Sequence, residues 1–442
     1  MEDIIGRDWA RSLRSKFSIT ELNAMQQESF AAIESGRDVM LFSPTGSGKT
    51  LAFLLPLMRL LDPKLEEVQL LILVPSRELA QQIEQVARTL GTGLKVNSVY
   101  GGRSGMQDRL DLKQKPAVLI GTPGRLADRF RRDEINLDEV RYLALDEFDK
   151  SLEIGFEKEM KEIVRSLPNV AQRVLTSATG ATTIPEFVGV IDPEVVNYSG
   201  PQSEALTIKA FKASHPNKLE TLKEVLLSHQ GQPGVIFCNF KNTLFEVSDY
   251  LSDQRIIHGT FYGGMEQLDR DRSLITFRNG THQLLLATDL AARGLDIPEI
   301  KFIIHFEIPL HEEEFTHRNG RTARMHREGE AIILQHPESR TPQYYRDMKL
   351  PLEQTEPASN RMVKLPTYRT LYISGGRRDK ISKGDVAGLM FKQGGLQKEE
   401  LGVIELQQDC AYVGVVREKA QEVAERTTNT KLKKKKVRIS IL

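Results

Sequence analysis

This chain of 442 residues contains few cysteines and tryptophans and carries a small net charge. The two cysteines, Cys238 and Cys410, are too few for a disulfide framework, which excludes the class of small disulfide-rich secreted domains. The sequence also lacks a secretory signal segment and an apolar run long enough to cross a bilayer. We therefore expect a soluble protein of a reducing compartment, the cytoplasm, without a membrane partner.

The net charge is only +1 although 27% of the residues are charged, so electrostatic attraction must come from local patches. One such patch is the last segment, Pro366–Leu442, which holds 16 Lys and Arg against 9 Asp and Glu. This segment also contains the only low-complexity stretch, Lys433–Lys436. Basic residues are therefore concentrated at the C-terminal end.

Short apolar runs alternate with helical patterns over the first 350 residues, which is typical of βαβ units and a parallel sheet. The pattern restarts after a polar stretch at Ser199–Glu204, and a second break covers Leu352–Lys364. We therefore expect an α/β protein in three parts, residues 1–200, 205–350 and 366–442. The predicted strands are Val39–Phe42, Leu70–Val74, Ala117–Ile120, Tyr142–Leu145 and Arg173–Ser177, then Gly234–Cys238, Leu284–Ala287, Phe302–His305 and Ala331–Leu334.

A glycine-spaced loop, Ser43–Thr50, follows the first predicted strand and precedes a predicted helix at Leu51–Leu61. This order of strand, loop and helix is typical of a phosphate-binding loop, in which backbone N–H groups and the helix N-terminus surround an anion. Lys49 would reach the β- and γ-phosphates, and the Thr50 hydroxyl would ligate Mg²⁺. The alternative is a Gly/Ser turn before a surface helix. Ser43 departs from the usual first glycine.

Two carboxylates, Asp146 and Glu147, follow the predicted strand Tyr142–Leu145. Ligands of open α/β sheets bind at the carboxyl ends of the strands, so this pair lies where a nucleotide site needs it. Asp146 suits Mg²⁺, and Glu147 suits orienting and deprotonating an attacking water. The alternative is a helix N-cap followed by an acidic first turn.

An ordered series of motifs resembles the DEAD-box RNA helicases of superfamily 2, over about residues 9–340. The resemblance implies two tandem RecA-like parallel-sheet domains that use ATP, Mg²⁺ and RNA. The motifs that carry it are Ser43–Thr50, Pro75–Ala80, Gly101–Gly102, Thr122–Arg125, Asp146–Asp149, Ser177–Thr179, Ala287–Asp289, Arg293–Asp296 and His317–Arg324.

The resemblance assigns an ATP site built from both domains. Gln26 would read adenine, although the neighbouring Gln27 makes this assignment dependent on register, and Trp9 would lie against the base or be an ordinary core or surface aromatic. Arg321 and Arg324 would act as arginine fingers, unless this run of charge is a solvated helix face. The full set for the nucleotide is Trp9, Gln26, Ser43, Thr45, Gly46, Ser47, Gly48, Lys49, Thr50 and Asp296, and the catalytic set is Lys49, Asp146, Glu147, Arg321 and Arg324.

The same resemblance assigns RNA contacts to loops that follow successive strands, where small residues allow close backbone approach and Arg or Thr holds phosphates and 2′-hydroxyls. Gly102 and Gly124 are equally compatible with plain turn glycines. The predicted RNA contacts are Arg77, Gly102, Thr122, Gly124, Arg125, Arg270 and Thr288, and the residues predicted to couple ATP to RNA are Asp149, Ser177, Thr179 and Asp289.

Two residues depart from the family pattern. Phe148 stands where Asp-Glu-x-Asp usually has alanine, and Ala323 stands where a glycine usually separates the two arginines. A ring in place of a methyl group costs about 1–3 kcal/mol in a core that has not adapted, so we expect adapted neighbours and retained activity.

The last 75 or so residues resemble the RRM-like α+β domain that ends DbpA-type helicases, where it tethers the enzyme to a structured ribosomal RNA hairpin. Arg377, Arg378, Lys380 and the loop Lys433–Lys436 are the predicted phosphate contacts, with a solvated basic face as the alternative. Tyr372 would stack on a base or pack in the core. The tail offers few aromatic residues, so we expect recognition of hairpin shape.

The resemblance therefore implies a monomeric, RNA-stimulated ATPase that separates short RNA duplexes when its two RecA-like domains close, acting in assembly of the large ribosomal subunit. The alternatives are an ATP-gated RNA clamp with weak unwinding, which Phe148 favours, and a DNA helicase.

Overall fold

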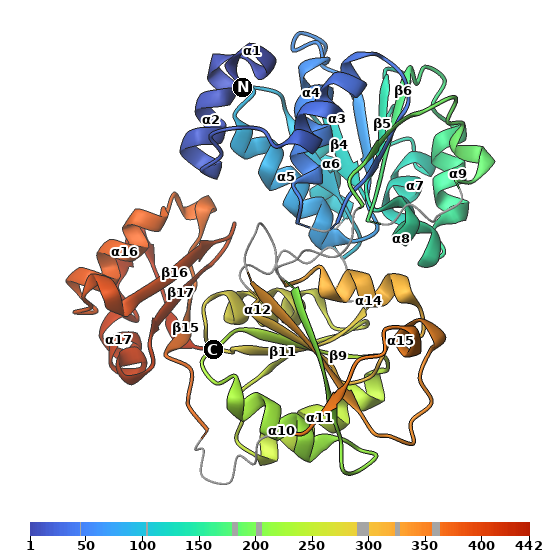
Figure 1. Ribbon diagram of the computed structural model, residues 1–442. Coiled ribbons are helices and arrows are strands. Elements are labelled where there is room, and N and C mark those ends of the chain that lie inside the picture. Colours follow the sequence, from blue (N-terminus) through green and yellow to red (C-terminus); the bar gives the residue numbers. More distant parts are fainter. Residues whose placement is uncertain are drawn as a thin grey trace. The chain divides into compact units, whose positions relative to one another are not determined.

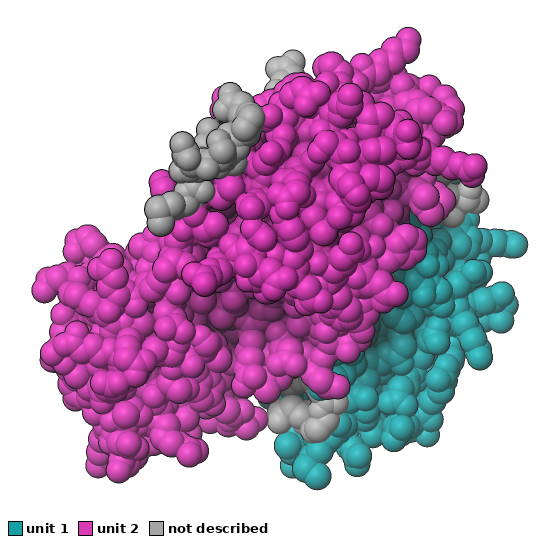
Figure 2. Space-filling model, turned by 90° about the horizontal axis from the view of Figure 1, so that it is seen from below, with its two compact units in different colours: residues 1–202, 293–296 teal, residues 203–292, 297–442 magenta. Residues whose placement is uncertain are grey.

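The computed structural model describes residues 1–44, 46–102, 105–178, 184–199, 206–289, 300–322, 328–355 and 363–442. These residues form two compact units, which Figure 2 shows in different colours. The first unit takes the described residues up to 199, and the second takes those from 206 onward. Each unit is described by itself.

The first unit is built on a seven-stranded sheet in which every pair of neighbouring strands is parallel. Its strands follow the spatial order β3 (Val96–Val99), β4 (Val118–Gly121), β2 (Leu70–Leu73), β5 (Tyr142–Leu145), β6 (Gln172–Ser177), β1 (Val39–Phe42) and β7 (Glu194–Asn197).

Helices cover both faces of this sheet, because successive strand residues point to opposite sides and both sides are apolar (Figure 1). In β2, Leu70 and Ile72 join one core cluster, whereas Leu71 and Leu73 join the other. The helices of the unit are α1 (Glu2–Ile5), α2 (Arg7–Phe17), α3 (Ala24–Glu34), α4 (Lys49–Arg59), α5 (Arg77–Leu90), α6 (Gly105–Leu112), α7 (Pro123–Arg131), α8 (Phe148–Glu153), α9 (Glu157–Arg165) and the 3₁₀ turn Glu186–Val188.

The second unit contains another seven-stranded parallel sheet. Its order is β10 (Gly259–Phe261), β11 (Leu284–Thr288), β9 (Gly234–Cys238), β12 (Phe302–His305), β13 (Gly329–Gln335), β8 (Leu206–Lys212) and β14 (Leu352–Glu353). Its helices are α10 (Leu219–Ser228), α11 (Lys241–Asp253), α12 (Gln267–Arg278), α14 (Glu312–Asn319) and α15 (Gln343–Asp347).

The second unit also carries a small antiparallel sheet from the C-terminal segment, which we call the tail sheet. Its order is β16 (Leu401–Leu406), β17 (Ala411–Val416), β15 (Tyr368–Ile373) and β20 (Ile439–Ile441). Helices α16 (Lys383–Lys392) and α17 (Ala420–Thr427) share one core with one face of this sheet (Figure 1). A short hairpin of β18 (Lys431–Leu432) and β19 (Lys435–Lys436) precedes β20.

The predicted fold class, two parallel-sheet domains and a small α+β tail, is confirmed. The second sheet runs beyond the predicted end at residue 350, because β14 pairs with β8 inside the predicted break. Both residues of β14 are exposed, so the strand has no apolar pattern. Helix α4 begins at Lys49, not at Leu51, because Gly48 adopts the left-handed conformation and starts the helix there. No helix in the described ranges is long and apolar enough to cross a membrane.

Candidate nucleotide and RNA sites

The strand order brings the predicted site residues of the first unit to one edge of its sheet. Because all neighbouring strands are parallel, the loops that follow β1, β6 and β5 lie next to one another, and those after β2, β4 and β3 continue the row. The phosphate-binding loop follows β1, Ser177 ends β6, and the acidic pair follows β5. The predicted RNA loops follow β2, β4 and β3.

The phosphate-binding loop is held from within by its own lysine. The Lys49 ammonium group donates to the backbone carbonyls of Ser43 and Pro44, and its nitrogen lies 2.8 Å from the Pro44 oxygen. Lys49 is buried, and the loop's glycines, Gly46 and Gly48, have φ angles of 85° and 94°, which other residues rarely adopt. The turn at Gly46 and Gly48 is therefore already formed, with the Lys49 ammonium group held against the carbonyls that begin the loop.

Gln26, and not Gln27, contacts this loop. Its amide nitrogen donates to the Gly48 carbonyl at 3.3 Å, and its amide oxygen closes a capping box with Asn23 at the start of α3. The Gln27 amide donates instead to the Leu22 carbonyl. The contact agrees with the predicted register, while the reading of adenine by Gln26 stays a prediction. Trp9 packs, half-buried, against the apolar core of the first unit.

The acidic pair after β5 is tied to β6 by Thr176. The Thr176 hydroxyl donates to the Asp146 carboxylate and accepts from the Glu147 backbone N–H at 3.2 Å. Glu147 has a φ of 49° and is the left-handed N-cap of α8, so the chain turns at the acidic pair before the helix begins. Burial, followed by the negative charge of Glu147, raises the pKa of Asp146 to about 6. Sequence reasoning missed Thr176, although it directly precedes the motif at Ser177.

Strand β6 also contacts the phosphate-binding loop. The backbone N–H of Ser43 donates to the Ser177 carbonyl at 3.1 Å, and Phe42 pairs with Ser177 in the ladder. Asp149, in the first turn of α8, is buried and lies 4.0 Å from the Lys150 ammonium group. Ser177 and Asp149, two of the predicted coupling residues, are therefore both buried close to the acidic pair, one at the end of β6 and the other in α8.

Phe148 fills the second core of the first unit. Its side chain is 1% exposed and belongs to the apolar cluster with Leu126, Met160 and Ile163. The expectation that neighbours accommodate the ring agrees with this burial. The ring points into the core on the face that α7 and α9 cover.

The predicted RNA loops lie together, with two different roles for their glycines. Arg77 lies against Gly102, where an added Cβ would come within 2.5 Å of the guanidinium group, and Gly102 has a φ of 88°. The positive φ therefore favours glycine at 102, whereas the Arg77 guanidinium group is the end of a flexible side chain and does not by itself require one. At Gly124 an added Cβ would meet only Phe156, at 3.8 Å, so packing does not require a glycine there. Thr122 is buried at the N-cap of α7.

Arg125 is not a free cation in the first unit. Its guanidinium group pairs with the fully buried carboxylate of Asp108, at 2.7 and 2.9 Å, and Arg129 lies 3.6 Å from the same carboxylate. Asp108, on α6, thus positions Arg125 on α7. Sequence reasoning did not identify this partner, because β4 separates α6 from α7 along the chain.

In the second unit, Asp289 forms a buried ion pair that sequence reasoning did not identify. The Arg318 guanidinium group contacts both Asp289 oxygens, with its Nε at 2.6 Å, and also donates to the Glu307 carbonyl and the Asn239 amide oxygen. Arg318 is 2% exposed. Because it stands on α14 and Asp289 follows β11, the pair fixes the helix that carries the predicted arginine motif. Arg321 is buried directly after this helix.

Two further predicted RNA contacts belong to the second unit. Thr288 ends β11 and is buried. Arg270, on α12, lies over the Phe261 ring at 4.4 Å from its centroid, which is a cation–π contact. Four predicted site residues, Thr45, Thr179, Asp296 and Arg324, lie outside the described residues.

Comparison with known proteins assigns the chain to a family. Residues 23–187 match the DEAD/DEAH box helicase model, residues 217–326 the helicase conserved C-terminal domain, and residues 370–441 the DbpA RNA binding domain. The chain is 33% identical over 431 residues to the ATP-dependent RNA helicase DbpA of Escherichia coli strain K12, covering 95% of this chain and 94% of the relative. The chain is a DEAD-box ATP-dependent RNA helicase of the DbpA type. It is therefore an RNA-stimulated ATPase.

Further relatives agree with this assignment. DbpA of Bacillus subtilis strain 168 is 29% identical over 470 residues, covering 99% of this chain and 98% of the relative. Among solved structures, S. cerevisiae Dbp5 bound to RNA and ADP BeF3 matches with a TM-score of 0.68 at 24% identity, covering 76% of this helicase and 90% of that chain. Mss116p bound to ssRNA and AMP-PNP also matches with a TM-score of 0.68, at 22% identity, covering 81% of this helicase and 78% of that chain. At this identity the two structures support the fold.

The tail of the helicase presents its predicted basic residues unequally. Arg377, Arg378 and Lys380 are exposed on the turn after β15, where Arg378 pairs with Asp409 at 2.9 Å. In the lysine hairpin, Lys433 pairs with Asp385 at 2.9 Å and Lys435 with Asp379 at 2.8 Å. Within the described ranges, Lys434 and Lys436 have no carboxylate partner. The tail thus holds alternate lysines by ion pairs and leaves others exposed.

Tyr372 is not part of the tail core. Leu371 and Ile373 point to the core that α16 and α17 cover, so Tyr372 lies on the opposite face of the sheet. There it is half-exposed and meets the buried Tyr412 edge-on, with ring centroids 5.6 Å apart. Of the two alternatives left open by the sequence, packing in the tail core is wrong, and stacking on a base stays a prediction.

The residues of the first unit fit a Mg²⁺–nucleotide complex. Among the described residues no group of three His, Cys, Asp or Glu could hold a metal ion, but Mg²⁺ is usually held by only one or two carboxylates together with waters and substrate phosphates. Asp146 is a buried carboxylate whose ionised form is disfavoured, and a cation would relieve that cost. The buried hydroxyls of Ser43 and Ser47 have no hydrogen-bond partner in the described part of the chain. The loop therefore offers unused polar groups beside a preformed turn.

Proposed function

We propose that this helicase separates short RNA duplexes locally, through ATP-driven closure of its two RecA-like domains. The observation that carries the proposal is the arrangement at the carboxyl edge of the first sheet. There the phosphate-binding loop, the acidic pair and the predicted RNA loops follow adjacent strands, and β6 contacts the first two.

In this mechanism Lys49 leaves the Ser43 and Pro44 carbonyls, to which it now donates, and holds the β- and γ-phosphates. Thr50 and Asp146 hold Mg²⁺, which neutralises charge on the phosphates when it is bound. Glu147 orients the attacking water and accepts its proton. Trp9 and Gln26 hold the base, with the remaining loop residues and Asp296 completing the nucleotide site.

Arg321 and Arg324 act as arginine fingers in the closed state, so that hydrolysis depends on closure. Because ATP and RNA both favour that state, each raises the apparent affinity of the other, as linkage requires. Asp149, Ser177, Thr179 and Asp289 transmit the state of the nucleotide to the RNA contacts. Those contacts are Arg77, Gly102, Thr122, Gly124, Arg125, Arg270 and Thr288.

The tail selects the RNA. We assign it to structured ribosomal RNA, and the helicase to assembly of the large ribosomal subunit in the cytoplasm, where it acts as a monomer. The support is the DbpA-type domain at residues 370–441 and the exposed basic turn and hairpin, including Arg377, Lys380 and Lys434. Cys238 and Cys410 are both free thiols, which agrees with a reducing compartment.

The test compares ATP hydrolysis and separation of a short duplex in the intact chain, in Lys49→Ala and Glu147→Gln, and in a chain that ends at residue 365. Intact protein should hydrolyse ATP and separate strands only when RNA is present, and the two site variants should do neither. Deleting the tail should abolish the preference for ribosomal RNA over unrelated RNA. An unchanged preference contradicts the tail assignment, and equal stimulation by DNA contradicts the RNA assignment.

An ATP-gated RNA clamp is the second candidate, and the buried ring of Phe148 next to the catalytic carboxylates is the observation that favours it. The clamp predicts that intact protein retains RNA in the presence of ATP but leaves a short duplex paired. Strand separation by wild-type protein excludes it.

A further inference from the structure

Aromatic side chains gather at the carboxyl edge of the second parallel sheet. Strands β10, β11 and β9 end side by side there, because Phe261 pairs with Ala287 and Thr288 pairs with Cys238. The segments that follow β10 and β9 therefore begin next to Thr288, which ends β11 and is a predicted RNA contact. Each of these two segments carries an aromatic residue within two positions of its strand.

We call Phe240, Lys241, Phe245 and Tyr262 the aromatic edge. The Phe245 and Tyr262 rings meet edge-on, with centroids 5.1 Å apart. The Lys241 ammonium group lies 4.7 Å from the Tyr262 centroid and 5.4 Å from the Phe245 centroid, in two cation–π contacts. Lys241 is nevertheless exposed. The two rings thus hold a positive charge at the surface, directly after Phe240.

Phe240 is 61% exposed, although it follows a buried strand closely. It is the N-cap residue of α11, and its side chain makes no cap hydrogen bond. Ser, Thr, Asn or Asp at this position would accept from a backbone N–H of the first turn, so phenylalanine forgoes a stabilising contact. The ring also leaves a large apolar surface in water. A residue that breaks two local rules without a gain in the fold indicates a functional role.

The aromatic edge is continuous with the RNA contacts predicted for the second unit. Tyr262 directly follows Phe261, the ring over which Arg270 lies, and the end of β11 at Thr288 lies between the two strand ends. Cations therefore accompany the rings on both sides. Exposed rings beside positive charge are what proteins use to hold single-stranded nucleic acid, because bases stack on the rings while cations meet the backbone.

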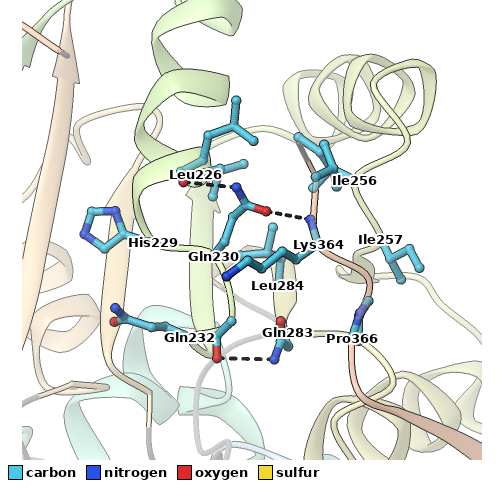
Figure 3. A pocket seen from close by; sticks show the side chains of 13 residues that line it. Leu226, His229, Gln230, Gln232, Ile256, Ile257, Gln283, Leu284, Lys364 and Pro366 are labelled. Atoms are coloured by element: carbon cyan, nitrogen blue, oxygen red, sulfur yellow. Dashed lines mark hydrogen bonds between the residues drawn. The ribbon is translucent and has the colours of Figure 1, made fainter. Parts of the chain in front are cut away.

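The amino edge of the same sheet has a different surface. Figure 3 shows a pocket there, bordered by Gln283 and Leu284 where β11 begins and by Gln232 shortly before β9. The residues that line this pocket include no Phe, Tyr or Trp. A flat base would therefore meet exposed rings at the carboxyl edge and not in the pocket.

We propose that Phe240 stacks on a base of single-stranded RNA, with Lys241 beside the adjoining phosphate. The contacts predicted from the sequence go to phosphates and 2′-hydroxyls, so Phe240 adds a contact to a base. The contact tolerates any sequence, because every base has a flat face. A base inside a duplex has both faces covered by its neighbours, so the ring favours an unpaired base. This inference rests on the proposed RNA function.

The test measures the affinity of the full chain for a short single-stranded RNA in the presence of a non-hydrolysable ATP analogue. Phe240→Leu keeps an apolar side chain without a ring, and it should weaken binding by about fivefold or more, the lower end of what stacking on an aromatic residue contributes. Phe240→Trp should retain wild-type affinity. Phe391→Leu is the matched control, because Phe391 is an exposed phenylalanine on α16, and it should leave affinity unchanged.

The second arm uses an abasic RNA with the same backbone and no bases. Wild-type protein and Phe240→Leu should bind this RNA equally, because nothing remains to stack. At saturating intact RNA, Phe240→Leu should also reach the wild-type rate of ATP hydrolysis, and only the RNA concentration for half-maximal stimulation should rise. A variant with a damaged fold would lose the maximal rate as well.

Equal affinities of wild-type protein and Phe240→Leu for intact RNA overturn the stacking and leave the aromatic edge to a protein partner. An equal loss of affinity on intact and abasic RNA also overturns it, because the ring would then act on the backbone. In both cases wild-type protein still binds RNA, so the proposed function stands. If wild-type protein binds no single-stranded RNA, the proposed function fails and the stacking fails with it.

Discussion

Replacing Phe148 by alanine, the residue usual in the family, should destabilise the first unit and not improve it. The ring is 1% exposed and belongs to the core cluster between the sheet and helices α7 and α9. Its neighbours pack around a ring, so a methyl group would leave a cavity that a close-packed core fills only in part.

The expected loss is about 3–5 kcal/mol, the usual range for a buried phenylalanine truncated to alanine. For a unit of this size, each kcal/mol lowers the melting temperature by about 2–4 °C, so the midpoint should fall by about 6–20 °C. Since domains are stable by about 5–15 kcal/mol, the variant should fold but with little margin.

Trp9 provides the assay, because it is the only tryptophan and packs against the core of the first unit. Its fluorescence, followed through urea unfolding without nucleotide, reports that unit alone. Phe130→Ala is the matched control: Phe130 is only partly buried at the edge of the same cluster, and its truncation should cost less. Wild-type stability in Phe148→Ala would refute the reasoning, because the ring would then not be filling the core.

Three further outcomes are expected. Gly48→Ala should weaken binding of a fluorescent ATP analogue at least tenfold, because its Cβ would lie 2.6 Å from the Gln26 amide nitrogen and would displace the side chain that is predicted to hold the base. Gly36→Ala, also at positive φ but with nothing within 4 Å, should leave binding intact. Burial, then the nearby charge of Arg318, lowers the pKa of His305 to about 3; the unfolded chain, with a value near 6.5, binds more protons as pH falls. The second unit should therefore lose about 2 kcal/mol between pH 6.5 and 5 in urea unfolding, and His305→Gln should remove that part of the slope. Asp289→Asn should lower the free energy of unfolding of the second unit by about 3–5 kcal/mol, because it removes the carboxylate that pairs with the buried Arg318 charge. Hydrogen exchange of the second unit measures this free energy, and a loss below about 1 kcal/mol would show that the pair is unimportant to stability.

The strands that could be predicted from the sequence are those with continuous apolar runs. Tyr142–Leu145 and Gly234–Cys238 match β5 and β9 residue for residue, because both lie inside parallel sheets covered on two faces. β3 was missed because Asn97 and Ser98 interrupt its apolar pattern, although both are buried. β14 was missed because an exposed edge strand of two residues leaves no pattern to read.

In the candidate site, motifs located the residues but not their partners. Thr176 and Asp146 are 30 residues apart in sequence, and Arg318 and Asp289 are 29 apart, so only the sheet brings each pair together. The Thr370 hydroxyl on β15 is similar, since nothing in the sequence around it indicates that it meets Thr281, just after α12. Pairings between distant segments depend on strand order and register, which local patterns do not contain.

Strand order also explains how the first unit can couple its two halves. β6 lies between β5 and β1, so its last residues face the acidic pair on one side and the phosphate-binding loop on the other. The Thr176 side chain bonds Asp146, and the Ser177 carbonyl accepts from the Ser43 N–H. In the proposed mechanism, a change of charge at Asp146 and a movement of the loop would therefore act on two consecutive residues, Thr176 and Ser177. Because Ser177 begins the predicted coupling motif, we expect the position of β6 in the sheet, more than any single contact, to link the nucleotide to the rest of the helicase in the proposed mechanism.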